Sequence, residues 1–384
     1  MKKYFIFAIA ALAASAACSN VETLDTPKDT LIGFNVVKYA AKTRAYNSLL
    51  DEFYYQGADT TMIESFTTNA WFHDGAAAYG PQQFMSDQTI APDDASDPSY
   101  WSPSGRNYYW PKTGYINFFS YAGSPVPTAK AENSLTYANV SVVPGSNILV
   151  ADAAYRYSAN NDPATYGQNS VTKGVPTLFR HILSRVKFDV VLDAKNGMAN
   201  PDSLDKWTVT ITSASINVPQ QGTIRLTFED PGTTETVKFD TDSVWTGLGS
   251  RTDIDKVAGD VVLTAVGGKI SDTTVVEGSA TGIAAELIAE SSVIPHTIWV
   301  ADTDSVTFTM NYTIAYQYDG GTAITEDVTV PATALKTFTP TITSWAMNTK
   351  YTYHIIIKPN GAVLFDPAVE TWVEETDEPS YTVD

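Results

Sequence analysis

The sequence predicts an all-β protein built from β-sandwiches. In the clearest strand, residues 306–318, apolar side chains occupy every second position, and Thr, Asn or Gln fill most of the others. This period of two is that of a strand with one buried and one wetted face. A turn at residues 319–321 and a second alternating run at 324–330 complete a hairpin. Only 17% of the residues are charged, which suits sheet surfaces rich in Thr, Ser and Tyr.

The same alternation recurs elsewhere in the second half of the chain. Clusters of Gly, Pro, Asn and Asp separate four further runs, at residues 186–192, 207–211, 224–228 and 351–357. Helical patterns are few. Residues 47–53 could form one short helix and residues 282–290 two helical turns, and we expect both to be connectors. Short strands with frequent turns favour sandwiches over other all-β folds.

The chain begins with the pattern of a bacterial export signal. Two lysines precede an apolar run at residues 4–14, and small residues then lead to Cys18. The run is shorter than the ~20 apolar residues that a membrane-spanning helix needs. A cysteine after two small residues is typical of a lipobox, so we expect cleavage before Cys18 and a lipid on its sulfur. Ser15 stands where a lipobox usually has an aliphatic residue, which leaves open ordinary signal-peptidase cleavage.

The charge and the cysteine content exclude several classes of function. The chain has 24 basic and 43 acidic residues and a net charge of −19. Such a chain repels phosphate backbones, so nucleic acid is not an expected partner. Cys18 is the only cysteine, which leaves no intrachain disulfide and no cysteine-based metal site.

No motif points to catalysis. The four histidines form no metal-ligand pair, and nucleophile-elbow, phosphate-loop and dinucleotide motifs are absent. Paired acids such as Asp240 and Asp242 could hold Ca²⁺, but solvated loop carboxylates are the simpler interpretation. We therefore expect no enzyme activity, no cofactor and no metal.

Aromatic residues concentrate between residues 71 and 123. Because aromatic faces stack on sugars, Trp101 and Trp110 could form the glycan platform of a non-polymerising surface lipoprotein. The alternative, which we favour, is that these rings fill a core. Residues 154–174 form a polar stretch that we interpret as a loop, and we place a domain boundary near residue 174.

Four motifs follow one another along nearly the whole chain. They are the export signal with strand 32–36 and residues 43–45, an aromatic block at 108–122, the segments 147–151 and 178–188, and the closing segments 345–353 and 365–372. In this order they resemble the fimbrillin-like (Mfa/FimA-type) pilins of Bacteroidetes.

The resemblance implies two transthyretin-like β-sandwich domains after an N-terminal lipoprotein signal and tether. By position, residues 1–17 are the signal peptide, 18–44 the tether with a propeptide strand, 45–174 the N-terminal sandwich and 175–384 the C-terminal sandwich. It also implies a fimbrial subunit that contributes to adhesion and travels to the outer membrane as a lipoprotein. Other fimbrial subunits are the implied partners, and a host glycan or protein is a candidate ligand.

The resemblance further implies assembly by strand exchange. An arginine-specific protease would cut between Arg44 and Ala45 and so remove the strand at 32–36. A donor strand from another subunit would then fill the opened groove by β-augmentation. The alternative is that Arg44 is not cut and that the protein stays a lipid-held anchor or tip subunit. Donor candidates lie within residues 363–383 and include Val363, Phe365, Val369 and Trp372.

Overall fold

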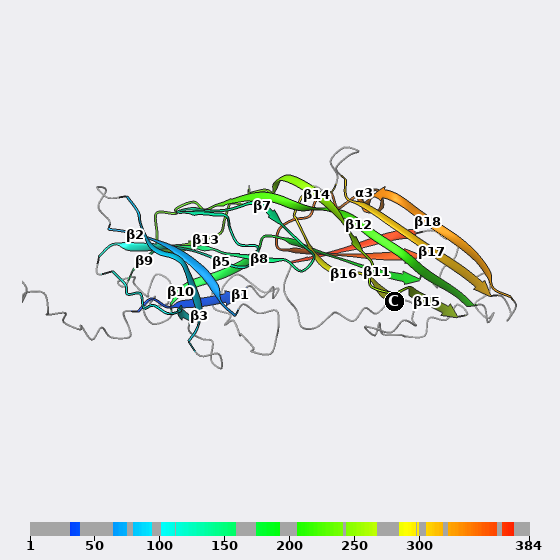
Figure 1. Ribbon diagram of the computed structural model, residues 1–384, viewed down its shortest axis with the longest axis horizontal. Helices are drawn as coiled ribbons and strands as arrows, with labels where there is room; N and C mark the ends of the chain where they lie inside the picture. The colour runs from blue at the N-terminus through cyan, green and yellow to red at the C-terminus, as the bar shows by residue number, and fades with distance from the viewer. Residues whose placement is uncertain are drawn as a thin grey trace, which may run out of the picture.

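Nearly all the regular structure of the chain is β-sheet, as the alternation predicts. The computed structural model describes residues 31–38, 64–74, 80–93, 101–111, 113–158, 174–192, 206–240, 243–266, 284–296, 298, 305–317, 322–358 and 363–371. These residues form an elongated body, with β2 and β9 toward one end and β17 and β18 toward the other (Figure 1).

The elements follow one another as twenty strands and one short helix in the described residues. They are β1 Phe34–Lys38, β2 Phe66–His73, β3 Gln82–Pro92, β4 Trp101–Pro103, β5 Tyr115–Ser124, β6 Ala129–Ala131, β7 Ser134–Ser141, β8 Asn147–Ala151, β9 Ala153–Tyr157, β10 Val175–His181, β11 Ser184–Leu192, β12 Lys206–Thr227, β13 Glu235–Val237, β14 Thr246–Asp255, β15 Val261–Val266, β16 Ala284–Val293, β17 Thr307–Gln317, β18 Ile324–Ala334, α3 Leu335–Phe338, β19 Thr349–Ile357 and β20 Val363–Thr371.

A nine-stranded, barrel-like sheet forms the first part of the molecule. Its strands lie in the order β13-β9-β5-β2-β3-β4-β1-β10-β8, and a further pairing of β5 with β8 closes the ring. The side chains inside it form the barrel core, which contains Ile32, Phe34, Phe66, Ala70, Met85, Ile90, Trp101, Tyr108, Trp110, Ile116, Phe118, Ala122, Leu149, Ala151, Ala154, Tyr157, Val175 and Phe179. Closure leaves few sheet edges open to other chains.

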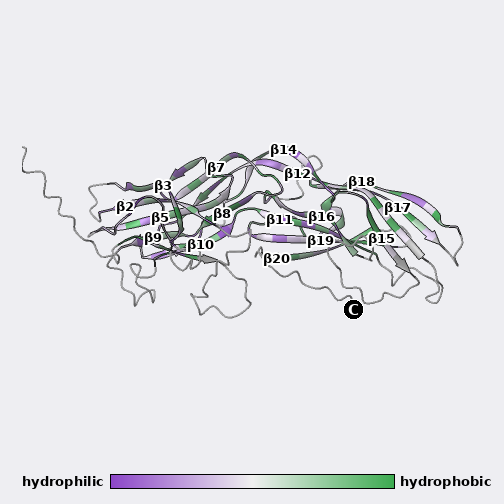
Figure 2. Ribbon diagram, turned by 60° about the horizontal axis from the view of Figure 1, so that its bottom comes forward, coloured by the Kyte–Doolittle hydropathy of each residue, from purple (hydrophilic) through white to green (hydrophobic). Residues whose placement is uncertain are grey.

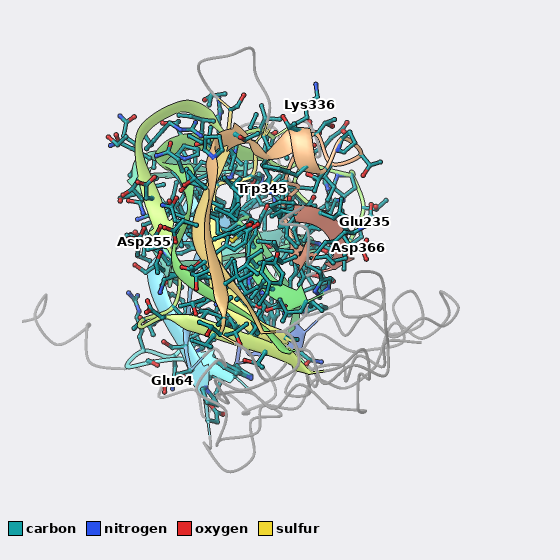
Figure 3. All side chains as sticks on the ribbon, turned by 90° about the vertical axis from the view of Figure 1, so that its right-hand side faces the viewer. Glu64, Glu235, Asp255, Lys336, Trp345 and Asp366 are labelled. Atoms are coloured by element: carbon teal, nitrogen blue, oxygen red, sulfur yellow. The ribbon has the colours of Figure 1, made fainter. Side chains whose placement is uncertain are left out.

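Two further sheets pack face to face in the second part. One has four strands in the order β16-β11-β19-β20, and the other has seven, with β18-β17-β12-β7-β6 in line and β14 and β15 paired to β12. Alternate side chains of both sheets meet in the sandwich core, which includes Val186, Phe188, Val190, Val209, Ile211, Phe308, Tyr312, Trp345, Tyr353 and Ile355. In the view down the long axis, Trp345 lies near the centre, and Lys336, Asp255 and Asp366 lie toward the outside (Figure 3).

The strand β12 links the two parts. Its first half pairs with β15 and β17, and residues 221–227 pair with β7. There it covers the middle core, the buried residues around Phe119, Tyr137, Ile224 and Trp245. The sequence predicts two strands at 207–211 and 224–228, and the structure corrects this to one strand of 22 residues. The Pro and Gly between them are accommodated in an extended backbone that pairs with β14.

The other strand predictions have mixed outcomes. The predicted strands at 306–318, 324–330, 186–192 and 351–357 are confirmed as β17, β18, β11 and β19. Along these strands, hydrophobic (green) and hydrophilic (purple) residues alternate in places (Figure 2). The predicted helical turns at 282–290 are wrong, because residues 284–293 form β16 and pair with β11. The predicted helix at 47–53 lies outside the described residues.

The predicted loop at 154–174 is also corrected in part. Residues 153–157 form β9, which pairs with β5 and β13. The strand after the predicted domain boundary, β10, belongs to the barrel-like sheet, between β1 and β8. The boundary itself stays a prediction.

Candidate functional site: the slot occupied by β1

β1 lies between two strands that come from distant parts of the chain. On one side it runs parallel to β10, from Phe34 opposite Val175 to Lys38 opposite Phe179. On the other side it meets β4 through one antiparallel pair, Phe34 with Trp101. We call the position between β4 and β10 the β1 slot. Parallel pairing is slightly weaker per residue than antiparallel pairing, so five parallel pairs hold β1 modestly.

Residues just before β1 add two backbone hydrogen bonds. The Ile32 amide donates to the Tyr108 carbonyl at 2.8 Å, and the Val175 amide donates to the Gly33 carbonyl at 2.8 Å. The slot strand therefore extends from residue 32 and is bonded on both sides. Removing it would leave backbone groups of the β4 side and of β10 without partners.

Apolar side chains of this segment fill the barrel core. Ile32 is 1% exposed and Phe34 is fully buried. The Phe34 ring meets Phe66 and Phe118 edge to face, with ring centroids 5.6 Å apart in both pairs. Edge-to-face contacts add to the gain from burying each ring. Side-chain packing thus adds to backbone pairing in holding β1.

Gly174 lets the slot strand approach closely. Its φ is +80°, and a Cβ there would lie 2.7 Å from the carbonyl carbon of Phe34 and 2.9 Å from that of Gly33. Both distances are far inside van der Waals contact. A side chain at position 174 would therefore push the slot strand away, and the positive φ independently favours glycine.

Groups outside the slot brace β10. The Arg180 guanidinium donates two hydrogen bonds to Asp152, at 2.8 and 2.9 Å. The His181 ring pairs with Asn147 at 2.9 Å, and the His181 amide donates to Asn348 at 3.3 Å. None of these contacts involves β1. We therefore expect the wall formed by β10 to keep its place when β1 leaves.

β20, which contains three of the predicted donor residues, lies at an edge of the four-stranded sheet. It pairs antiparallel with β19 from Val363 to Thr371. Phe365 packs in the sandwich, with its ring 5.2 Å from Phe308 and stacked 4.3 Å from Phe338. Val363 also packs against the sandwich core, whereas Val369 is 54% exposed. Trp372 lies outside the described residues.

The predicted processing residues also lie outside the described residues. Cys18, Arg44 and Ala45 therefore stay predictions. The predicted propeptide strand at 32–36 overlaps β1, Phe34–Lys38.

The glycan platform is not formed by the tryptophans that suggested it. Trp101 is 3% exposed and Trp110 is 6% exposed, and both belong to the barrel core. A buried indole offers no face to a sugar. The preferred interpretation of these residues, that they fill a core, is confirmed.

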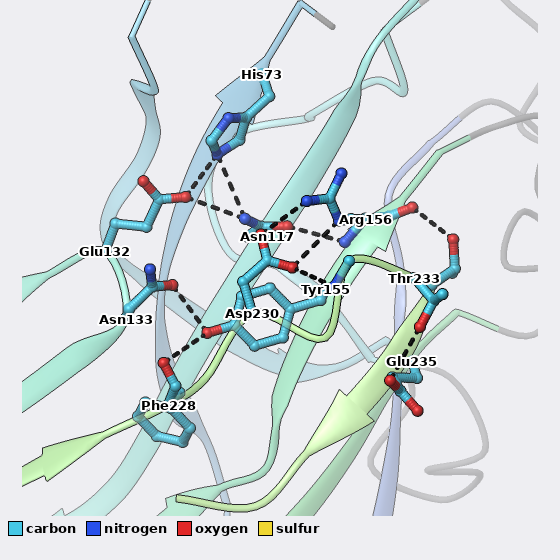
Figure 4. Close-up of polar contacts among 12 residues, drawn as sticks. His73, Asn117, Glu132, Asn133, Tyr155, Arg156, Phe228, Asp230, Thr233 and Glu235 are labelled. Atoms are coloured by element: carbon cyan, nitrogen blue, oxygen red, sulfur yellow. Dashed lines mark hydrogen bonds and ion pairs between the residues drawn. The ribbon is translucent and has the colours of Figure 1, made fainter.

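A polar network at the barrel, which no sequence motif indicates, joins β2, β5 and β9 (Figure 4). His73 Nε2 lies 2.5 Å from Glu132 Oε1, and Asn117 donates to the same oxygen at 3.0 Å. Arg156 donates two hydrogen bonds to Asp230, at 3.2 and 2.9 Å. Burial raises the pKa of Asp230, but hydrogen bonds from Arg156 and a backbone amide outweigh burial and lower it overall.

The network explains how β13 stays against the barrel rather than suggesting a reaction. Asn117 also accepts the Arg156 amide at 2.8 Å, and Thr234 donates to the Arg156 carbonyl at 3.0 Å. Each charged group of this network has a partner on a neighbouring segment. The residues are far apart in sequence, so only the fold reveals the cluster.

Two negative findings concern the described residues. Within them, no group of three or more His, Cys, Asp or Glu side chains could hold a metal ion. No described helix is long and apolar enough to cross a membrane.

The fold and the slot define an all-β protein whose first sheet is completed by a strand from the N-terminal segment. A model of the fimbrillin-like family matches residues 57–372, and the chain belongs to this family. Its members are structural adhesion proteins rather than enzymes, and membership implies a place in cell-surface fimbriae. No curated protein matches the chain significantly.

The solved structures that match the chain have low sequence identity to it. A candidate cell adhesion protein from Bacteroides uniformis is 16% identical, with 91% of this chain and 100% of that chain covered and a TM-score of 0.41. A fimbrial protein from Bacteroides vulgatus is 13% identical, with 90% of this chain and 100% of that chain covered and a TM-score of 0.39. The tip fimbrial protein Mfa3 from Porphyromonas gingivalis, with a C-terminal truncation, is 8% identical. The match covers 81% of this chain and 94% of that chain, with a TM-score of 0.36.

Proposed function

We propose that the protein is a structural subunit of cell-surface fimbriae that assembles by strand exchange at the β1 slot. In this proposal the precursor reaches the outer membrane as a lipoprotein anchored at Cys18. An arginine-specific protease then cuts between Arg44 and Ala45. The observation that carries the proposal is that β1 is an internal strand of a closed sheet and lies N-terminal to that bond.

Cleavage would change the barrel core directly. Release of residues 18–44 removes Ile32 and Phe34, which are nearly or fully buried. It exposes the aromatic rings that surround Phe34 and the unpaired edges of β4 and β10. An apolar groove with two free edges is a strong template for another strand.

Two of the other sheet edges, those of β18 and β20, are less suited to pairing. β18 presents Glu326, Asp327 and Pro331, and β20 presents Asp366 and Pro367. Charged residues and proline on an edge strand oppose the addition of a further strand. We therefore expect the emptied β1 slot to be preferred over these two edges as the acceptor.

The donor comes from the C-terminal region of a second subunit, with Val363, Phe365, Val369 and Trp372 as the first candidates. Donation from one subunit into the next does not close on itself, so it produces a filament. The acceptor slot lies in the barrel-like sheet and β20 lies in the four-stranded sheet, so acceptor and donor candidates lie in different parts of each subunit.

Proteolysis of the purified chain tests the proposal. Treatment with an arginine-specific protease should give a species that begins at Ala45 and elutes as oligomers in size-exclusion chromatography with light scattering. Arg44→Gln should stay uncut at this bond and monomeric. Arg106→Gln, at an exposed turn residue, is the matched control and should behave as the wild type. A cut chain that has lost β1 and stays monomeric would contradict the proposal.

A further inference from the structure

We propose that Ile182 and Leu183, together with Trp245 and Asn348, form a rigid junction that locks the barrel to the sandwich and carries tension through the subunit. We call these four residues the junction. Its rigidity is a property of the single chain and does not depend on assembly. Its use under tension rests on the proposed function, because a subunit is pulled along its length only within a fimbria.

The junction lies where the three sheets meet. Ile182 and Leu183 connect β10, in the barrel-like sheet, directly to β11, in the four-stranded sheet. The Ile182 amide donates to the Ile148 carbonyl of β8 at 3.1 Å. Trp245 Nε1, just before β14 of the seven-stranded sheet, donates to the Ile182 carbonyl at 3.1 Å. The Asn348 amide, just before β19, donates to the Leu183 carbonyl at 3.0 Å.

Asn348 holds the junction with its side chain as well as its amide. Its φ is +56°, a left-handed conformation that asparagine adopts more readily than most residues. Its side-chain oxygen accepts the amide of His181, the last residue of β10, at 3.3 Å. Ser184 Oγ, at the start of β11, donates to the Ala346 carbonyl at 2.5 Å. The segment 346–348 therefore bonds to the chain before, within and after the junction link.

The side chains of Ile182 and Leu183 make bending unfavourable. Both are fully buried in the middle core. The same core contains Phe119 of β5 and Ile294, which follows β16, so both parts of the molecule contribute to it. A hinge needs backbone that can change its dihedral angles at little cost. Bending here would break hydrogen bonds to three sheets and expose two apolar side chains, so the junction resists it.

The junction also lies on a covalent path from the β1 slot to the far sheet. β10 borders the slot and runs parallel to β1. β11 follows the junction and pairs in parallel with β19 over nine residue pairs, and β19 pairs with β20 over nine more. A pull on a strand in the slot therefore passes along β10 and through the junction into the four-stranded sheet. A rigid junction keeps the two parts from separating around that path.

Distance measurements between two spin labels test the rigidity in the uncut chain. Thr89→Cys in β3 and Ala332→Cys in β18 are exposed label positions, and Cys18→Ser removes the native thiol. Double electron–electron resonance should give one narrow distance distribution. Asn348→Gly keeps the left-handed backbone but loses the side-chain acceptor. Combined with Trp245→Phe, it should widen the distribution about twofold, because the link then loses bonds to two sheets.

Two further variants keep this test decisive. Asn348→Asp retains a side-chain oxygen and tolerates the left-handed backbone, so it should restore the narrow distribution. Asn348→Gly alone should widen the distribution less and replaces the double variant if thermal unfolding shows that the latter does not fold. A broad distribution in the labelled parent chain would overturn the inference. Folded junction variants that stay as narrow as the parent would overturn it as well.

Force spectroscopy on oligomers of the cut chain tests the role under tension. Each subunit should unfold in a single step, whereas subunits with Asn348→Gly and Trp245→Phe should unfold in two smaller steps at lower force. Equal forces and steps would overturn the role under tension. If the uncut chain gives the narrow distribution but the cut chain never oligomerises, the proposed function fails and the rigid junction stands.

Discussion

The strands nearest the two ends of the described chain, β1 and β20, join their sheets in opposite ways. β1 lies inside a closed sheet, pairs in parallel with β10 over five residue pairs and buries Phe34 completely. β20 lies at a sheet edge, pairs antiparallel with β19 over nine pairs and leaves Leu364 46% and Val369 54% exposed.

The difference shows which strand can be exchanged with the larger gain. Loss of β1 leaves two open edges and an empty aromatic pocket, so the free energy recovered by a new strand is large. Loss of β20 leaves one open edge, that of β19, and the other three strands of the sheet stay paired. β1 is short, has few backbone pairs and buries side chains in the barrel core, so another strand with fitting side chains can replace it. β20 is long and extends the edge of its sheet. Four substitutions test this comparison.

The largest expected effect is at β1. Phe34→Ala leaves a cavity between Phe66 and Phe118 and should lower the free energy of unfolding of the uncut chain by about 3–5 kcal/mol. Urea denaturation measures it. Leu364→Ala, at an exposed position of β20, is the control and should stay within about 0.5 kcal/mol. Similar losses for the two variants would break the comparison.

A smaller loss is expected at the buried face of β20. Phe365 is only partly buried, so Phe365→Ala should cost about 2–3 kcal/mol through its contacts with Phe308 and Phe338. Val369→Ala, on the same strand but half exposed, should cost less than about 1 kcal/mol. If Phe365→Ala has no effect on urea denaturation, β20 is not anchored in its own sandwich and becomes the better donor.

The sheet that contains β20 also carries a pH-dependent contribution. Burial raises the pKa of Glu290, but hydrogen bonds from Lys350 and Arg185 outweigh it and hold that pKa below the ordinary value of 4.5. The charged carboxylate therefore stabilises the fold above pH 4.5, and this stabilisation is lost as the pH falls through the lower, folded-state pKa.

Glu290→Gln should accordingly lower the free energy of unfolding by about 1 kcal/mol at neutral pH, and this difference should shrink as the pH falls below 4.5. Denaturation curves over a pH series measure this. Glu326→Gln, at an exposed position of β18, should show no such trend. A Glu290→Gln effect that stays constant down to acid pH would rule out the charge as its cause.

The smallest effect is expected at the free edge of β20. Pro367 pairs with Tyr353 of β19 and has no amide hydrogen to offer a further strand. Pro367→Val restores that donor and should give weak, concentration-dependent self-association of the uncut chain, visible by sedimentation velocity. Ala368→Val on the next residue is the control and should stay monomeric. An unchanged Pro367→Val variant would show that other features protect this edge.

Much of the fold could be predicted from alternation, because a strand with one buried face shows its period directly. β17 and β19 are such strands, and their predicted bounds are close to the observed ones. β16 was not predictable in this way. Its Ala-, Glu- and Leu-rich run favours a helix locally, and only pairing with β11, with register shifts on either side of Phe188, makes it a strand.

Some features of the candidate site could likewise be predicted from the sequence, and others could not. The sequence predicts a strand at 32–36, and β1, Phe34–Lys38, overlaps it, whereas its removal is implied only by the family resemblance and stays a prediction. The parallel partner of β1 could not be predicted, because β10 is about 140 residues away and the intervening strands decide the neighbour. The close approach of Gly174 and the unpaired Trp110 nitrogen also arise from packing, which a single sequence does not encode locally.

Amide hydrogen exchange on the two sides of β10 tests most directly whether β1 can be replaced by a strand from another subunit. The Val175 amide bonds to the carbonyl of Gly33, just before β1, whereas the Asp152 amide bonds to Leu178 on the opposite side of β10. Val175 should be protected in the uncut chain, exchange quickly in cut monomers and be protected again in oligomers, while Asp152 stays protected throughout. A Val175 amide that stays protected in cut monomers, or unprotected in oligomers, would contradict strand exchange at this slot.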